Sequence, residues 1–225
     1  MQIEARFRRR ATATENVVDL HVQLLRSLSG IESLWQKDRS PSEILSDLGD
    51  GESAVVDISS CLAFEIQGAV SYASRMPAAI MDKAISDDSL VLLFNLDLVD
   101  FKKCCCNIFP EVVRRFSPYR AAVITDLDQD LDDFEEIVRE AQKLRKDVDG
   151  RDSVFRIQTV NYFDNLMCMR AFGIGAADVV RKLKESIFLA EELQSGAFLV
   201  IDAEPAVGDR LLTIDSTIRQ NLLAL

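Results

Sequence analysis

An apolar run that passes directly into an acidic helix is the feature that most constrains the fold of this chain. Residues Tyr119–Thr125 are mostly apolar, which is typical of a buried strand. Beyond them, apolar residues recur at helical spacing. Their positions are Leu131, Phe134, Val138, Ala141, Leu144 and Val148. We therefore predict a core strand followed at once by an amphipathic helix.

Carboxylates crowd the junction between this strand and this helix. They are Asp126, Asp128, Asp130, Asp132, Asp133, Glu135 and Glu136. A helix N-terminus favours negative charge, so a capped and solvated helix start explains much of the run. The other interpretation is a negative surface, on the N-terminus and outward face of the helix, that meets a positively charged partner.

Strand and helix patterns alternate along the rest of the chain. Ile3, Ala5 and Phe7 alternate with charged residues, which predicts a strand with one wet face. Further strands or extended segments are predicted at residues 54–60, 62–70, 90–96 and 154–160, and helices at 110–116, 176–184 and around 211–222. Residues 187–193 and 197–203 flank Gln194–Gly196 and predict a hairpin. Hairpins mixed with helices indicate an α+β fold, in which helices pack on a mixed or antiparallel sheet. We expect one domain over residues 1–225, and the length also allows two subdomains with a break near residues 75–88.

Local capping signals mark two further helix starts. Thr14 is positioned to cap a helix that ends near Gly30. Ser40 and Glu43 form a capping box around Pro41, which is the strongest boundary signal in the sequence.

Composition excludes several classes of function. The chain has 37 acidic and 26 basic residues and a formal net charge of -11, so phosphate backbones and anionic membranes would repel it. No apolar stretch approaches the roughly 18 residues of a membrane span. Cys61, Cys168 and the contiguous Cys104–Cys106 fit neither a disulfide framework nor a zinc-ligand spacing, so we predict free thiols. We expect a cytoplasmic protein that binds neither nucleic acid nor membrane.

A search for catalytic chemistry finds little. The single histidine, His21, lies on the apolar side of a predicted helix and is interpreted as structural. Phosphate loops, nucleophile elbows and paired-histidine metal motifs are absent from the sequence. Asp126 and Asp128 follow a strand as the nucleophile pair of haloacid-dehalogenase-like phosphatases does, which leaves a metal-dependent phosphohydrolase as an alternative. We predict no catalytic residue, no bound metal and no cofactor.

The order of elements resembles a known family. The similar stretches are Glu15–Gly30, Leu34–Trp35, Arg39–Leu45, Phe109–Val123 and Leu193–Glu204. In these stretches the chain is similar to bacterial immunity proteins found beside polymorphic or type VI secretion toxins, in particular the family paired with restriction-endonuclease-like nuclease toxins. The resemblance implies a cognate toxin as partner, stoichiometric non-catalytic inhibition, and no catalytic residues.

Charge then suggests which residues contact that partner. A nuclease must be positive where it holds nucleic acid, so an acidic inhibitor can exploit complementary potential. We predict that the seven carboxylates between Asp126 and Glu136 form the contact patch. A second candidate is Asp47, Asp50 and Glu52, and a third is Asp87 and Asp88. Two alternatives remain open: an enzyme centred on Asp126 and Asp128, and an adaptor or chaperone that binds an effector without blocking it.

Overall fold

The computed structural model describes residues 1–36 and 53–223, and within these ranges eight strands form one sheet. The strand order is β2-β3-β4-β1-β5-β6-β8-β7, and every neighbouring pair is antiparallel. The strands are β1 (Gln2–Arg10), β2 (Ala54–Asp57), β3 (Ile66–Tyr72), β4 (Asp87–Asn95), β5 (Arg120–Ile124), β6 (Val160–Phe163), β7 (Leu189–Leu193) and β8 (Gly196–Val200). The predicted α+β class with an antiparallel sheet is confirmed.

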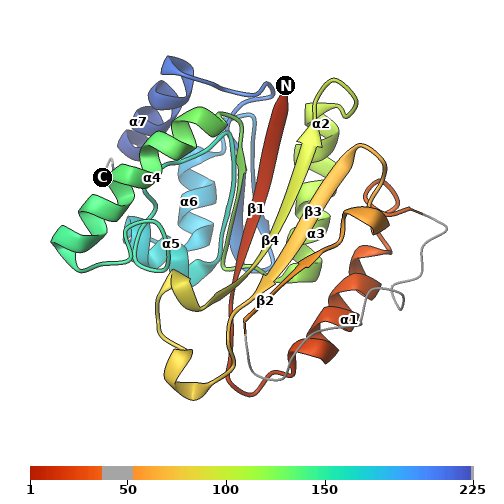
Figure 1. The fold of residues 1–225 in the computed structure, drawn as a ribbon. Coiled ribbons are helices and arrows are strands. Elements are labelled where there is room, and N and C mark those ends of the chain that lie inside the picture. The colour runs from red at the N-terminus through yellow and green to blue at the C-terminus, as the bar shows by residue number, and fades with distance from the viewer. Residues whose placement is uncertain (37–52, 224–225) are drawn as a thin grey trace.

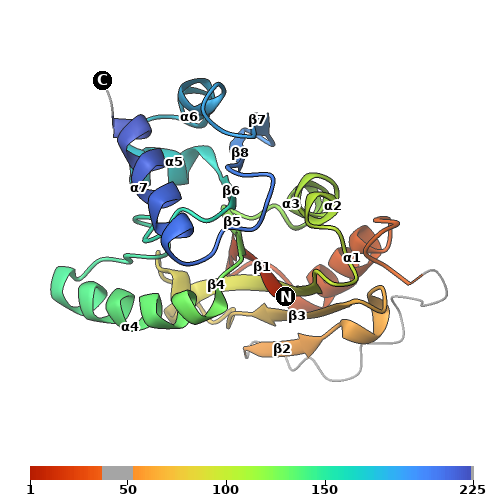
Figure 2. The same cartoon turned by 90° about the horizontal axis from the view of Figure 1, so that it is seen from above.

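Helices cover both faces of this sheet. They are α1 (Val17–Leu28), α2 (Phe101–Lys103), α3 (Phe109–Phe116), α4 (Leu127–Leu144), α5 (Asn165–Phe172), α6 (Ala176–Leu183) and α7 (Asp209–Leu223). A π-helical segment, η5 (Cys104–Ile108), joins α2 to α3. Figure 2 shows α1, α2 and α3 on one side of the sheet and α5, α6 and α7 on the other. Helix α4 lies along β1 and β5 on the face of the sheet opposite α3, and its start contacts the segment just before α7 (Figure 1).

The first strand lies in the middle of the sheet, between β4 and β5, and its alternating residues give it two different faces. Ile3, Ala5 and Phe7 are buried on one face, where Phe7 packs against Phe109 of α3 with ring centroids 5.0 Å apart. Phe7 also lies opposite Leu90 of β4 in the register. The predicted strand with one buried face is confirmed.

A second buried cluster fills the space beneath α5, α6 and α7. It includes Phe163, Met167, Val179, Leu199 and Ile218, which are all nearly inaccessible. The hairpin of β7 and β8 closes this end of the sheet through Gln194 and Ser195, both at positive φ. The predicted hairpin and the predicted amphipathic last helix are therefore present.

Two local predictions were wrong. Helix α1 is capped by Asn16 rather than Thr14, because the Asn16 side chain accepts a hydrogen bond from the Asp19 backbone N–H over 3.0 Å. Residues 154–159 do not form the predicted strand, and β6 begins only at Val160. Side chains of α7 satisfy this backbone instead, since Asp215 accepts from the Ile157 N–H over 2.7 Å. The capping box at Ser40–Glu43 lies outside the described residues.

Across the described residues, no helix combines the length and the apolar character that a membrane crossing requires.

Candidate protein-binding surface on helix α4

Helix α4 starts with a side-chain cap that also anchors it to a distant segment. Asp126 has extended backbone angles, and its Oδ1 accepts a hydrogen bond from the Gln129 N–H over 3.0 Å. Its Oδ2 accepts from the Gly208 N–H, just before α7, over 2.8 Å. The N–H groups of Gly208 and Gln129 hold the pKa of the Asp126 carboxyl below its ordinary value, although partial burial acts in the opposite direction. Asp126 therefore fixes the start of the helix, as the predicted helix cap requires.

Two further carboxylates of the run face the protein and form ion pairs there. Asp133 is buried, and Arg156 donates two hydrogen bonds to it, one from Nη2 to Oδ1 over 2.6 Å. Asp130 accepts from Nη2 of Arg6 on β1 over 3.1 Å. The hydrogen bonds from Arg156 to Asp133 raise the pKa of the Arg156 guanidinium, so this guanidinium stays charged. Two ion pairs therefore connect the inner face of α4 to strand β1 and to the segment before β6.

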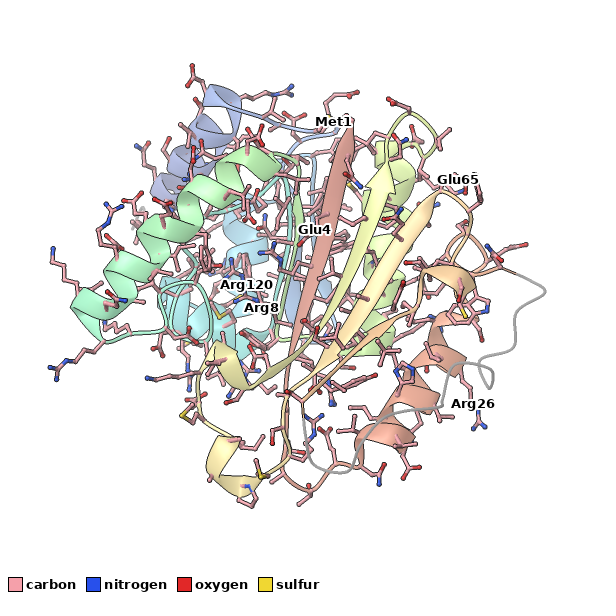
Figure 3. All side chains as sticks on the ribbon, in the orientation of Figure 1. Met1, Glu4, Arg8, Arg26, Glu65 and Arg120 are labelled. Carbon is pink, nitrogen blue, oxygen red and sulfur yellow. The ribbon has the colours of Figure 1, made fainter. Side chains whose placement is uncertain are left out.

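A small polar cavity lies behind this contact, between α4 and strands β1 and β5. Its volume is about 30 Å³, which is room for one or two water molecules. Arg120 lines it and pairs with Asp149 over 2.7 Å, and Arg8 donates to the Asp149 carbonyl oxygen over 2.6 Å. Figure 3 shows Arg8 and Arg120 between α4 and β1. Asp130, Asp133 and Ile137 of α4 line the same cavity, so the inner side of the helix is partly polar there.

The remaining carboxylates of the run face solvent. They are Asp128, Asp132, Glu135 and Glu136, and we call them the outer carboxylates. None of them forms a salt bridge with a residue that the structure describes. Exposed carboxylates that form no salt bridge project a negative potential into solvent. The run thus divides into a cap, two paired residues and four outward-facing charges.

Three apolar residues of α4 also face outward. Leu131 is 68% exposed, Phe134 is 62% exposed and Val138 is 39% exposed. The sequence pattern assigned the outward face to carboxylates, and this assignment is wrong for Asp130 and Asp133. The physical reason is that Arg6 and Arg156 offer buried partners to these two carboxylates, which turns the apolar side of the helix away from the sheet.

The predicted contact residues outside α4 are either outside the described residues or paired inside the protein. Asp47, Asp50 and Glu52 lie outside the described residues. Asp88 is fully buried, where Arg75 donates two hydrogen bonds to it over 2.9 and 2.8 Å and Arg9 donates a third over 2.7 Å. Asp87 accepts from Arg151 and from the Tyr119 hydroxyl over 2.6 Å. The structure therefore gives Asp87 and Asp88 internal partners and leaves the outer carboxylates at the surface.

The histidine and cysteine residues considered as catalytic or metal-binding groups occupy positions that suit a structural role. His21 is buried, and its Nδ1 lies 2.9 Å from the Tyr72 hydroxyl. Burial lowers the pKa of the His21 imidazole. All five cysteines are free thiols, as predicted. In the part of the chain that the structure describes, no group of three or more His, Cys, Asp or Glu side chains is arranged to hold a metal ion.

The arginines that face α4 were not predicted from the sequence as its partners. Arg6 and Arg8 were visible as the wet face of the first strand, and that alternation placed them on one side of the sheet. Nothing in the sequence indicated that α4 would cross that face and pair with Arg6.

A solved structure resembles this fold, whereas the sequence comparisons find no relative. Neither protein-family models nor curated proteins match the sequence. Among solved structures, the chain is similar to the Pseudomonas aeruginosa T6SS protein PA0821, with a TM-score of 0.59 and 12% sequence identity. The similarity covers 98% of this chain and 72% of that one. At this identity the likeness shows a shared fold that extends over nearly the whole described sheet.

Proposed function

We propose that this protein binds a cognate secreted toxin in the cytoplasm and neutralises it by stoichiometric, non-catalytic inhibition. The observation that carries the proposal is the set of outer carboxylates on α4. Their neighbours Asp126, Asp130 and Asp133 are used by the fold, whereas these four carboxylates form no salt bridge with a described residue, although Glu136 attracts the Arg156 guanidinium at longer range. A surface of this kind is suited to a positively charged protein partner.

A nuclease is the class of toxin that fits this charge best. Its cleft must be positive to hold a phosphate backbone, and carboxylates can occupy the positions of phosphates. The net charge of -11 adds long-range attraction to such a cleft. Complementary charge speeds association and disfavours wrong partners.

The shared fold supports a link to type VI secretion. A solved structure of the same fold is described as a T6SS protein. Type VI secretion is therefore the secretion system in which we place the cognate toxin. The resemblance of the sequence to immunity proteins supports the same role.

The geometry of Asp126 favours this role over a phosphohydrolase. Both of its carboxylate oxygens accept backbone N–H groups, from Gln129 and from Gly208, as a helix cap does. We therefore take Asp126 and Asp128 as part of a helix start.

Coexpression tests the proposal directly. The product of the adjacent gene is expressed with and without this protein, and surviving colonies and copurified protein are measured. Copurification with restored growth is the expected result. Copurification without restored growth would instead identify an adaptor, and toxicity without any copurification would reject the proposal.

A charge-matched pair of variants links the result to α4. The first variant changes Asp128, Asp132, Glu135 and Glu136 to Ser. The control changes four exposed acids elsewhere to Ser: Glu185, Glu191, Glu192 and Glu204. Both variants lose the same net charge, so weaker protection in the first alone assigns the effect to the position of the carboxylates.

A further inference from the structure

Helix α4 presents apolar side chains at the spacing of a recognition helix. Leu131, Phe134 and Val138 occupy positions i, i+3 and i+7, which lie on one face of an α-helix. Two of the three are more than 60% exposed, at 68% for Leu131 and 62% for Phe134. The same anchor spacing is used when a helix lies in the apolar groove of a partner.

The inner contacts of α4 hold this face ready for binding. Asp126 caps the helix, and Asp130 and Asp133 tie its inner side to Arg6 and Arg156. The helix therefore exists before any partner arrives. A preformed recognition element avoids the cost of ordering a segment on binding.

We propose that the face formed by Leu131, Phe134 and Val138 inserts into an apolar groove of the toxin, and that lysine or arginine side chains border this groove. This inference rests on the proposed function and specifies its interface. The apolar residues supply slowly dissociating contacts at the centre, and the outer carboxylates pair with the basic border.

Net charge disfavours a second copy of this chain as the occupant of this face. Two α4 helices packed in parallel through this face would bring two sets of outer carboxylates together, whereas an antiparallel pair would place these carboxylates near Arg139 and Lys143 of the other copy. The chains would also approach each other with a net charge of -11 each. Like charges at an interface disfavour that partner, whereas a basic border compensates every outer carboxylate.

Single substitutions on this face test the inference with purified protein. The probe is the product of the adjacent gene, and the dissociation constant is measured by calorimetry. Phe134→Ser and Leu131→Ser are each expected to weaken binding at least about 30-fold, as loss of a central anchor does. The matched control is Phe64→Ser, because Phe64 is 90% exposed and lies outside α4. We expect it to change affinity less than about twofold.

The outcomes separate this inference from the proposed function. Binding by the wild type with unchanged affinity in Phe134→Ser and Leu131→Ser would overturn the groove proposal and leave the function standing. Absence of wild-type binding would overturn both. Sedimentation of the wild type alone provides a further check: a dimer that Phe134→Ser converts to a monomer would show that a second copy covers this face. All three variants alter exposed side chains, so thermal unfolding is expected to confirm that they remain folded.

Discussion

The Arg156 guanidinium holds the buried Asp133 carboxylate with two hydrogen bonds and thereby joins the inner face of α4 to the segment before β6. Only 6% of the Asp133 side chain and 14% of the Arg156 side chain remain exposed. Removing one partner of such a pair leaves the other charge buried and without a compensating charge.

Replacing Asp133 is expected to destabilise the folded protein, because the ion pair with Arg156 is lost. We predict that Asp133→Ala lowers the free energy of unfolding by about 3 kcal/mol, because Arg156 is left without its carboxylate. Urea denaturation measures the change. The neighbouring Asp132→Ala is the control, and we expect it to alter stability by less than about 0.5 kcal/mol because Asp132 is exposed. Equal losses in both variants would contradict the inward orientation of Asp133.

Much of this arrangement could be predicted from the sequence. The alternation around Phe7, the apolar run that became β5 and the helical spacing from Leu131 each correspond to an observed element. Helical spacing defines a face but not which face meets the protein. For α4 that choice depends on Arg6 and Arg156, which are far from Asp130 and Asp133 in sequence.

The false strand at 154–159 has a similar cause. The segment lies against α7, where Arg219 Nη2 donates to the carbonyl oxygens of Val154 and Phe155 over 2.9 and 2.6 Å. Side chains replace the neighbouring strand as hydrogen-bond partners, and local patterning does not reveal such distant partners.

The pKa of Asp126 predicts a specific response to acid. Because its folded-state pKa lies below the unfolded value of about 3.9, its contribution to stability is complete above that pH. The contribution is lost as the pH falls through the folded pKa. Asp126→Asn keeps a capping side chain but does not titrate, so we expect its stability to fall less steeply than that of the wild type over this acidic range. Denaturation curves measured below about pH 5 compare the two proteins, and identical slopes would contradict the assigned shift.

The outer carboxylates should control the rate of association more than the lifetime of the complex. With the adjacent gene product as partner, changing all four to Ser is expected to slow association about tenfold at low salt and to flatten its salt dependence. Stopped-flow or surface-based kinetics at several ionic strengths provide both quantities. The charge-matched variant at Glu185, Glu191, Glu192 and Glu204 should keep most of the wild-type rate. Equal slowing in both variants would indicate that only net charge matters.

The cysteines are expected to react slowly in the folded protein. Burial raises the pKa of the Cys104 and Cys168 thiols to about 12, and it also raises the pKa of Cys105. Cys106 is only half buried, so we expect it to react first. A disulfide reagent near pH 8 should modify little beyond Cys106 in the native state and all five thiols in guanidinium chloride. Rapid modification of all five in the native state would contradict their burial.

Hydrogen–deuterium exchange of the complex with the adjacent gene product shows directly which segment of this protein the partner covers. We predict that exchange slows in the part of α4 from Leu127 to Ala141 when the partner binds, and that α5 and α6 exchange as in the free protein. Protection confined to other segments, with α4 exchanging as it does in the free protein, would contradict the assignment of this helix as the binding surface.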